Sequence, residues 1–84
     1  MRYQVTILRS AQKSLSKIRG SDFELLKTAI FRVAENPRPH GCCKLTGREG
    51  WRIRVGNYRV IYDIKYRQLV VNVVAIGDRK DIYR

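Results

Sequence analysis

An alternating apolar and polar pattern on both sides of residues 56–57 constrains the fold of this chain most. Residues 51–55 read WRIRV, residues 58–62 read YRVIY, and the Gly-Asn pair between them tolerates positive φ angles. Two alternating segments joined by such a pair predict a β-hairpin with a two-residue turn. Because the turn fixes the register, Arg54 is expected to lie directly opposite Arg59.

This register sorts the hairpin side chains onto two faces of the sheet. Arg52 and Arg54 share a face because side chains alternate along a strand, and Arg59 joins them from the partner strand. Like charges placed opposite each other destabilise a sheet, so three clustered arginines indicate a bound anion; a solvated basic face is the alternative. The opposite face is expected to pack on helices and carries Trp51, Ile53, Val55, Tyr58, Val60 and Tyr62.

Two helices are predicted between a first strand and this hairpin. Ser10 is placed to cap a helix that continues to about Arg19, with Gly20 as its stop. Ser21 and Glu24 have the spacing of a capping box that opens a second helix, and the sequence NPRP at 36–39 ends it.

The remaining patterns predict strands. Alternation over residues 3–7 predicts a short first strand, and residues 40–50 read as a glycine-rich loop. Strands over about 51–55, 58–64 and 69–76 with short connections form an antiparallel meander, and the almost continuously apolar last one suits a central strand covered on both faces. The predicted fold is therefore α+β, with one sheet packed on an antiparallel helical hairpin.

Length and charge limit the possible functions. The 84 residues form a single domain over 1–84, and 18 Lys and Arg against 7 Asp and Glu give a net charge of +11. Such a charge favours nucleic acid, an anionic membrane or an acidic protein as partner.

No apolar run approaches a membrane span of roughly 20 residues, and no signal peptide is expected. Cys42 and Cys43 are adjacent and His40 is the only histidine, so we expect a reducing cytosol and no metal site.

The last eight residues, GDRKDIYR, add to the basic character of the hairpin. A tail that leaves the last strand here is placed to bring Arg79 and Tyr83 back to the hairpin arginines. An aromatic ring among cations suits base stacking, whereas a frayed basic terminus is the alternative.

Along the chain, a predicted strand and a helix pair are followed by the segments NPRP, KLTG, WRIRVGNYRVIYDI and VVNVVAIGDRKDIY. This order resembles the RelE/ParE superfamily of bacterial toxins from toxin–antitoxin pairs. The resemblance covers essentially the full length, and its most specific parts are RVGNYRVIY and the terminal G-x-R…Y. RelE-type members enter the ribosomal A site and cut mRNA there. ParE-like members share the fold, poison DNA gyrase and lack the basic active-site set.

The resemblance implies a catalytic set of five residues. Arg52 and Arg54 match the two basic residues on the second strand of RelE, and Arg59 matches the arginine of its YR segment. Arg79 matches the arginine of the terminal G-x-R, and Tyr83 matches the closing tyrosine. Because all five positions hold a functionally plausible residue, we expect ribosome-dependent endoribonuclease activity rather than ParE-like inhibition of gyrase, which is the alternative.

The implied reaction is attack of an RNA 2′-hydroxyl on the adjacent phosphate, without a cofactor or metal. Arginine has a pKa of about 12.5 or above and is a poor base, so the arginines are expected to stabilise charge, while Tyr83 stacks a base or orients the hydroxyl. Two departures from the family pattern stand out. Asp78 occupies a position where many relatives have His or Lys, and only one residue follows Tyr83, so the additional C-terminal helix of some relatives is not expected. His40 matches no catalytic position.

Partners follow from the resemblance together with the charge. We expect a cognate acidic, RelB-like antitoxin that covers the helices and the arginines, the ribosome with its mRNA, and operator DNA only through the toxin–antitoxin complex. No membrane partner is expected, and a cytoplasmic location is. A plain RNA- or DNA-binding module is a further alternative. The residues expected to contact ribosomal RNA are Lys44, Arg48, Lys13, Lys17 and Arg19; for the loop with Lys44 and Arg48, a merely solvated loop is the alternative.

Overall fold

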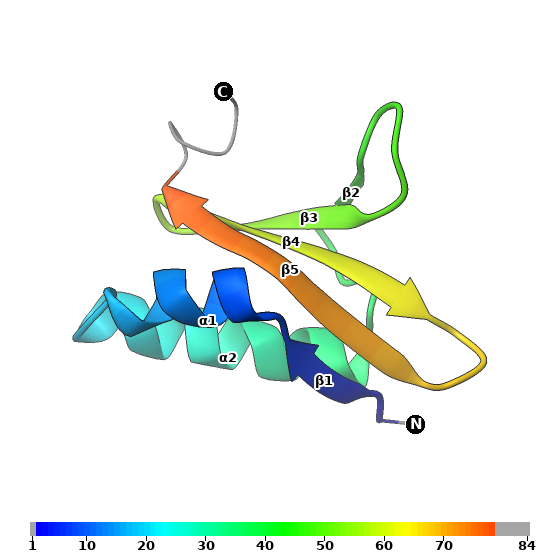
Figure 1. Cartoon of the computed structure of the whole chain (residues 1–84), viewed down its shortest axis with the longest axis horizontal. Helices are drawn as coiled ribbons and strands as arrows, with labels where there is room; N and C mark the ends of the chain where they lie inside the picture. Colours follow the sequence, from blue (N-terminus) through cyan, green and yellow to red (C-terminus); the bar gives the residue numbers. More distant parts are fainter. Residues whose placement is uncertain (1, 79–84) are drawn as a thin grey trace.

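Five strands form one mixed sheet, and both helices lie on the same face of it (Figure 1). The computed structural model describes residues 2–78. The sheet has the strand order β1-β5-β4-β3-β2. The predicted α+β fold is thereby confirmed. In chain order the elements are β1 (Gln4–Ile7), α1 (Arg9–Ser16), α2 (Ser21–Glu35), β2 (Cys43–Lys44), β3 (Trp51–Val55), β4 (Tyr58–Lys65) and β5 (Val70–Asp78).

The strand pairing combines the predicted meander with one parallel pair. β3, β4 and β5 pair antiparallel in sequence order, as their short connections indicate. β1 pairs parallel to β5, on the side of β5 that faces away from β4. β5 is therefore an interior strand, although its second face is only half-buried rather than fully covered.

A β-bulge interrupts the pairing of β4 with β5. Ile61 pairs with Ala75, but the next residue, Tyr62, pairs with Val73, so Val74 is an extra residue on β5. An extra residue shifts the side-chain alternation by one position. The shift keeps apolar residues on the helix side at both ends of the strand; the buried ones are Val71, Val73 and Ile76.

The core lies between the helices and the sheet. Tyr62 is fully buried and donates a hydrogen bond from its phenol to the backbone oxygen of Pro37 at 2.6 Å, which satisfies its polar end. Burial, with a further contribution from the nearby Cys42 thiol, raises the pKa of Tyr62 well above its usual range. The core cluster consists of Ala11, Leu26, Ile30, Val33, Ile53, Val60, Tyr62, Val71, Val73 and Ile76.

The first helix differs at both ends from the prediction. It begins two residues earlier, with Leu8 in place of Ser10 as the N-cap residue, and ends at Ser16 rather than near Arg19. Ser10 lies inside the helix and does not cap it. Its hydroxyl donates to the backbone oxygen of Val74 at 3.0 Å, so a contact with the bulge of β5 replaces the predicted cap.

The second helix begins without the predicted capping box. Gly20 is the N-cap residue with φ 68°, a left-handed conformation that glycine adopts without strain, and Ser21 is already helical. No side chain caps this end. The C-terminus is as predicted, because the helix ends at Glu35, directly before NPRP. Neither helix within residues 2–78 is long and apolar enough to cross a membrane.

Candidate functional site

The β3–β4 hairpin has the register that its sequence predicts. Arg54 lies opposite Arg59 and Val55 lies opposite Tyr58, with Gly56 in the turn at φ 58°. The tip of the hairpin lies near the start of α2, where the Tyr58 phenol donates to a carboxylate oxygen of Asp22 at 3.4 Å. Burial and this carboxylate raise the pKa of Tyr58. The hairpin is thus anchored to the helix layer at its turn.

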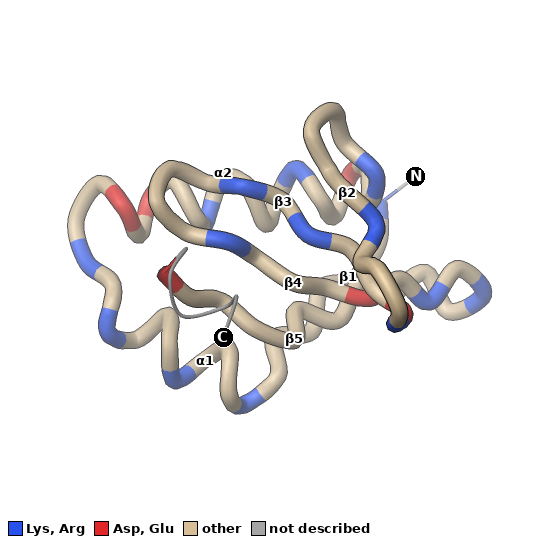
Figure 2. The backbone as a smooth tube through the Cα atoms, turned by 90° about the horizontal axis from the view of Figure 1, so that it is seen from above, with Lys and Arg blue, Asp and Glu red and all other residues tan. Residues whose placement is uncertain are grey.

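Three arginines share the face of the sheet that points away from the helices, which we call the arginine face (Arg52, Arg54 and Arg59). Figure 2 shows the basic segments side by side on β3 and β4. Their environments differ, because Arg54 is exposed, Arg52 is half-buried and Arg59 is only 5% exposed. The structure therefore presents an exposed guanidinium on β3 beside a buried one on the neighbouring strand β4.

The burial of Arg59 has a topological cause that strand alternation does not reveal. Arg59 is flanked by Arg54 on β3 and by Gly77 on β5, and the next residue on the same face, Ile61, is also buried. A guanidinium is more weakly hydrated than an ammonium group, which suits it to such a position. The interior position of β4 was the signal that could have indicated this burial.

Two carboxylates lie near the hairpin. Asp63 is on the same side of the sheet as the arginine face, but its carboxylate lies 3.6 Å from the ammonium group of Lys65 on the same strand. Asp78 is the register partner of Tyr58, and its charge contributes to the raised pKa of that phenol. Since direct partners share a face, Asp78 belongs to the helix side. The register therefore places Asp78 on the face opposite to the three arginines.

The predicted RNA-contacting residues are spread over several surfaces. Lys44 pairs with Trp51, and its Nζ lies 5.9 Å from the centre of the indole ring. This pairing places it on the side of the sheet opposite to the arginine face, because its neighbour Cys43 is the partner of Arg52. Arg48 is exposed in the connection between β2 and β3.

The basic residues near α1 are remote from the arginine face. Lys13, Lys17 and Arg19 are exposed, and α1 lies on the other face of the sheet (Figure 1). The structure therefore does not unite them with the predicted catalytic set. Arg79 and Tyr83 lie outside the described residues, so their place in that set stays a prediction. Within residues 2–78, no group of three or more His, Cys, Asp and Glu residues is arranged to hold a metal ion.

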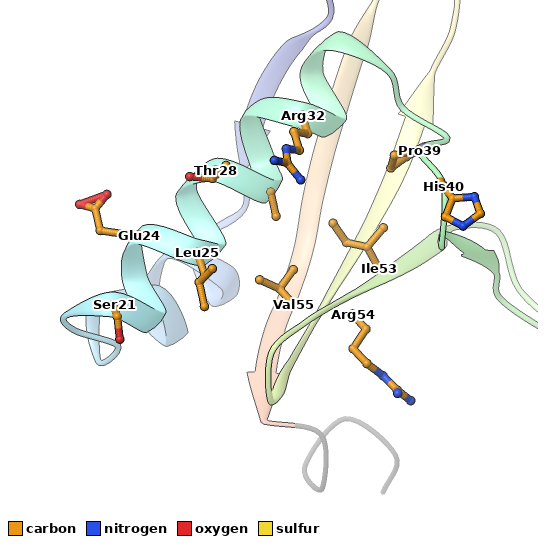
Figure 3. Close-up of a pocket in the computed structure, with 11 residues that line it drawn as sticks. Ser21, Glu24, Leu25, Thr28, Arg32, Pro39, His40, Ile53, Arg54 and Val55 are labelled. Atoms are coloured by element: carbon orange, nitrogen blue, oxygen red, sulfur yellow. The ribbon is translucent and has the colours of Figure 1, made fainter.

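A groove of about 690 Å³ lies between α2 and β3, and we call it the α2–β3 groove (Figure 3). His40, which matched no catalytic position, lines it together with Arg54. This groove was not predicted from the sequence. The sequence feature that could have indicated the groove is Leu25. This apolar residue of α2 lies beside the buried residues of the helix, and it is 53% exposed. The main lining residues are Leu25, Thr28, Ala29 and Arg32 of α2, Ile53, Arg54 and Val55 of β3, and Pro39 and His40 between them.

The fold and the site together define a small basic α+β protein whose arginines gather on the open face of a single sheet. A family model described as "ParE toxin of type II toxin-antitoxin system, parDE" matches residues 5–83. The chain belongs to this family, within the RelE/ParE superfamily that its sequence resembles. It is 28% identical over 88 residues to a putative RelE-like toxin protein of Escherichia coli, a match that covers 99% of this chain and 92% of the relative.

Solved structures support the same assignment. The RelE–RelB complex of the archaeon Pyrococcus horikoshii matches with a TM-score of 0.83 and 25% identity, over 94% of this chain and 97% of the other. The intact RelBE toxin–antitoxin complex of E. coli matches with a TM-score of 0.80 and 28% identity, over 90% and 95% of the two chains. The chain is therefore a RelE-like toxin of a type II toxin–antitoxin system.

Proposed function

We propose that this toxin is a ribosome-dependent endoribonuclease that cuts mRNA in the A site, and that the arginine face holds the reacting phosphate. The observation that carries the proposal is the direct opposition of Arg54 and Arg59, with Arg52 next along the same face of β3. Guanidinium groups that lie opposite each other on one face of a sheet offer paired donors to the oxygens of an anionic ligand such as phosphate. Arg54 is exposed and reaches the ligand, while Arg59 is buried and fixed in place.

The reaction requires stabilisation of a phosphorane that carries additional negative charge. The 2′-oxygen attacks phosphorus and loses its proton, the bond from phosphorus to the 5′-oxygen breaks, and that oxygen gains a proton. The products are a 2′,3′-cyclic phosphate and a 5′-hydroxyl. Guanidinium groups donate paired hydrogen bonds to phosphate oxygens, and loss of one such donor typically costs about 10²–10³ in rate. We assign this role to Arg52, Arg54 and Arg59.

The family positions of Arg79 and Tyr83 complete the proposed set. Arg79 adds a further cation, and Tyr83 stacks a base or orients the attacking hydroxyl. Asp63 forms an ion pair with Lys65, and Asp78 is the register partner of Tyr58 on the opposite face, so we assign the role of base to neither. The proposed rate enhancement therefore comes mainly from charge and from the orientation of mRNA by the ribosome.

The proposed partners follow from the relatives and from the charge. The RelE proteins of P. horikoshii and E. coli were solved as complexes with RelB antitoxins. We propose an acidic antitoxin for this chain as well, with operator DNA bound only through the complex, and a place of action in the cytosol. The net charge of +11 favours both this antitoxin and ribosomal RNA. Proposed rRNA contacts are Lys13, Lys17, Arg19, Lys44 and Arg48.

Primer extension on cellular mRNA after brief induction of the toxin tests the proposal. We expect cuts that follow the reading frame and disappear when the start codon of the reporter message is removed. Arg54→Ala and Arg59→Ala should abolish these cuts, whereas Arg67→Ala, an exposed arginine in the β4–β5 turn, should not. Growth arrest with relaxed plasmids and uncut mRNA would instead indicate a gyrase inhibitor. Binding of RNA without any cut would indicate a plain nucleic-acid-binding module.

A further inference from the structure

Two aromatic rings and two cations gather where β2 pairs with the start of β3, and we call them the ring–cation cluster (Arg38, Lys44, Trp51 and Tyr66). The Cζ atom of Arg38 lies over both rings, 6.0 Å from the centre of the Trp51 ring and 5.7 Å from that of Tyr66. The Nζ atom of Lys44 lies over the Trp51 ring at 5.9 Å. These distances are within the range of cation–π attraction. The proposed reaction does not use this cluster.

The backbone around Arg38 is fixed by its neighbours. Pro37 and Pro39 restrict the backbone on both sides of Arg38. The Arg38 amide donates a hydrogen bond to the side-chain oxygen of Asn36 at 3.2 Å, and the backbone oxygen of Pro37 accepts the hydrogen bond of the Tyr62 phenol. The exposed Arg38 side chain therefore starts from a preorganised backbone, which lowers the entropy cost of holding a ligand.

Tyr66 belongs to a constrained turn between β4 and β5. Leu69 in this turn has φ 55°, a left-handed conformation that is unfavourable for leucine. The backbone oxygen of Leu69 accepts a hydrogen bond from the Gln4 amide at 2.7 Å, and its amide donates to the backbone oxygen of Tyr66 at 3.4 Å. Tyr66 itself is 49% exposed. The turn therefore keeps an aromatic ring at the surface beside Arg38.

The cations of the cluster are not neutralised by carboxylates. Within residues 2–78, neither Arg38 nor Lys44 forms an ion pair, and both residues are exposed. Their charges attract an anion, while an aromatic ring and a guanidinium plane both stack on a flat, weakly polar group. A nucleotide combines the two properties, because it carries a phosphate and a planar base. An acidic peptide supplies the charge without the flat group.

We infer that the ring–cation cluster binds an unpaired base of a single-stranded nucleic acid. The base stacks on the exposed part of Tyr66 and on the guanidinium plane of Arg38, and the adjoining phosphate lies near Lys44. The inference goes beyond the proposed reaction, since Lys44 and Trp51 lie on the other side of the sheet from the arginine face. RNA and single-stranded DNA share this chemistry, and the choice of probe distinguishes them.

The fluorescence of Trp51 reports on this cluster directly, because it is the only tryptophan of the chain. The full-length toxin is titrated with a short oligothymidylate and with the same strand lacking its bases. Both strands carry the same phosphates, so they share the electrostatic part of the affinity. We expect the intact strand to quench Trp51 and to bind on the order of 10-fold more tightly than the abasic strand. Equal affinities, or binding without a change in Trp51 emission, would overturn the inference.

Two matched pairs of variants separate stacking from charge and from folding. Tyr66 and Phe31 are similarly exposed, at 49% and 56%. Tyr66→Leu should lose the preference for the intact strand, whereas Tyr66→Phe and Phe31→Leu should keep it. Arg38→Gln and Arg9→Gln each remove one exposed positive charge, and only Arg38→Gln should lower the preference. All of these variants should keep the melting temperature of the unmodified toxin. Retention of the preference in Tyr66→Leu, or its loss in Phe31→Leu, would contradict the inference.

An oligouridylate of the same length distinguishes the two kinds of strand. Both kinds fit the inference, and tighter binding of the oligouridylate would identify RNA as the ligand. The outcome is separable from that of the proposed reaction, because binding is measured without ribosomes. A toxin that cuts no mRNA can still bind a base at the cluster. Conversely, Arg54→Ala should lose the mRNA cuts and retain the preference for the intact strand.

Discussion

Replacing Arg54 by threonine should stabilise the free protein while it removes activity. Arg54 is exposed on β3 and lies directly opposite the buried Arg59. Since Val55 and Tyr58 flank the two-residue turn as a hydrogen-bonded pair, Arg54 and Arg59 form the closer, non-hydrogen-bonded kind of pair. Two unit charges about 5 Å apart repel by about 0.8 kcal/mol in bulk water, and cross-strand pairs contribute about 0.2–1 kcal/mol. We expect the free energy of unfolding to rise by about 0.5 kcal/mol.

Urea denaturation in low salt and in about 1 M NaCl measures this gain. At about 1 M salt the screening length falls to roughly 3 Å, so most of the gain should disappear. Arg54→Lys keeps the charge and should show no gain in either buffer. In a domain of this size the low-salt gain corresponds to a rise of about 2–4 °C in the melting temperature. A less stable Arg54→Thr protein, or a gain of equal size in both buffers, would refute the electrostatic account of the arginine face.

Three further predictions concern the fold around the site. Tyr62→Phe should cost about 1–3 kcal/mol in urea unfolding because the backbone oxygen of Pro37 loses its buried partner; an unchanged midpoint would contradict this. Above about pH 10 the unfolded chain should release its phenolic protons first, since the folded-state pKa values of Tyr62 and Tyr58 are raised. The melting temperature should therefore be insensitive to these groups below pH 10 and fall above it, less steeply in Tyr62→Phe. Gly56→Ala should cost about 1–2 kcal/mol at φ 58°, and Gly56→Asn less, as denaturation of both variants would show.

The hairpin could be predicted because its determinants are local. A two-residue turn and a period of two in the flanking segments fix the register, so the opposition of Arg54 and Arg59 follows from the sequence alone. The burial of Arg59 could not be predicted in this way. It depends on β5 lying on the other side of β4, a pairing that the predicted meander implies but that alternation within the hairpin does not show.

Helix ends and the smallest strand were harder to predict, since tertiary contacts compete with local signals. Ser10 has the chemistry of a cap, but its hydroxyl bonds to the backbone of Val74 on the bulge of β5. Ser21 was predicted to be a cap, yet Gly20 takes that position with a left-handed backbone. Lys44 read as a loop residue, whereas its pairing in β2 directs it toward Trp51.

Part of the candidate site was predictable from residue chemistry and part was not. The three hairpin arginines share a face as predicted, and their catalytic role stays a proposal. The basic residues near α1 and Lys44 do not gather with them, because charge counting does not reveal which side of the sheet a residue occupies. The α2–β3 groove also escaped prediction, since it depends on how α2 packs against the open edge of β3.

The central claim is that the arginine face stabilises the phosphorane of an RNA cleavage reaction. Its most direct test is the single-turnover rate of mRNA cleavage on programmed ribosomes, at toxin concentrations that saturate them, with analysis of the product ends. We predict 2′,3′-cyclic phosphate and 5′-hydroxyl ends, a rate lower by about 10²–10³ for Arg54→Ala, and an unchanged rate for Arg67→Ala. Equal rates for Arg54→Ala and the unmodified toxin would contradict the claim.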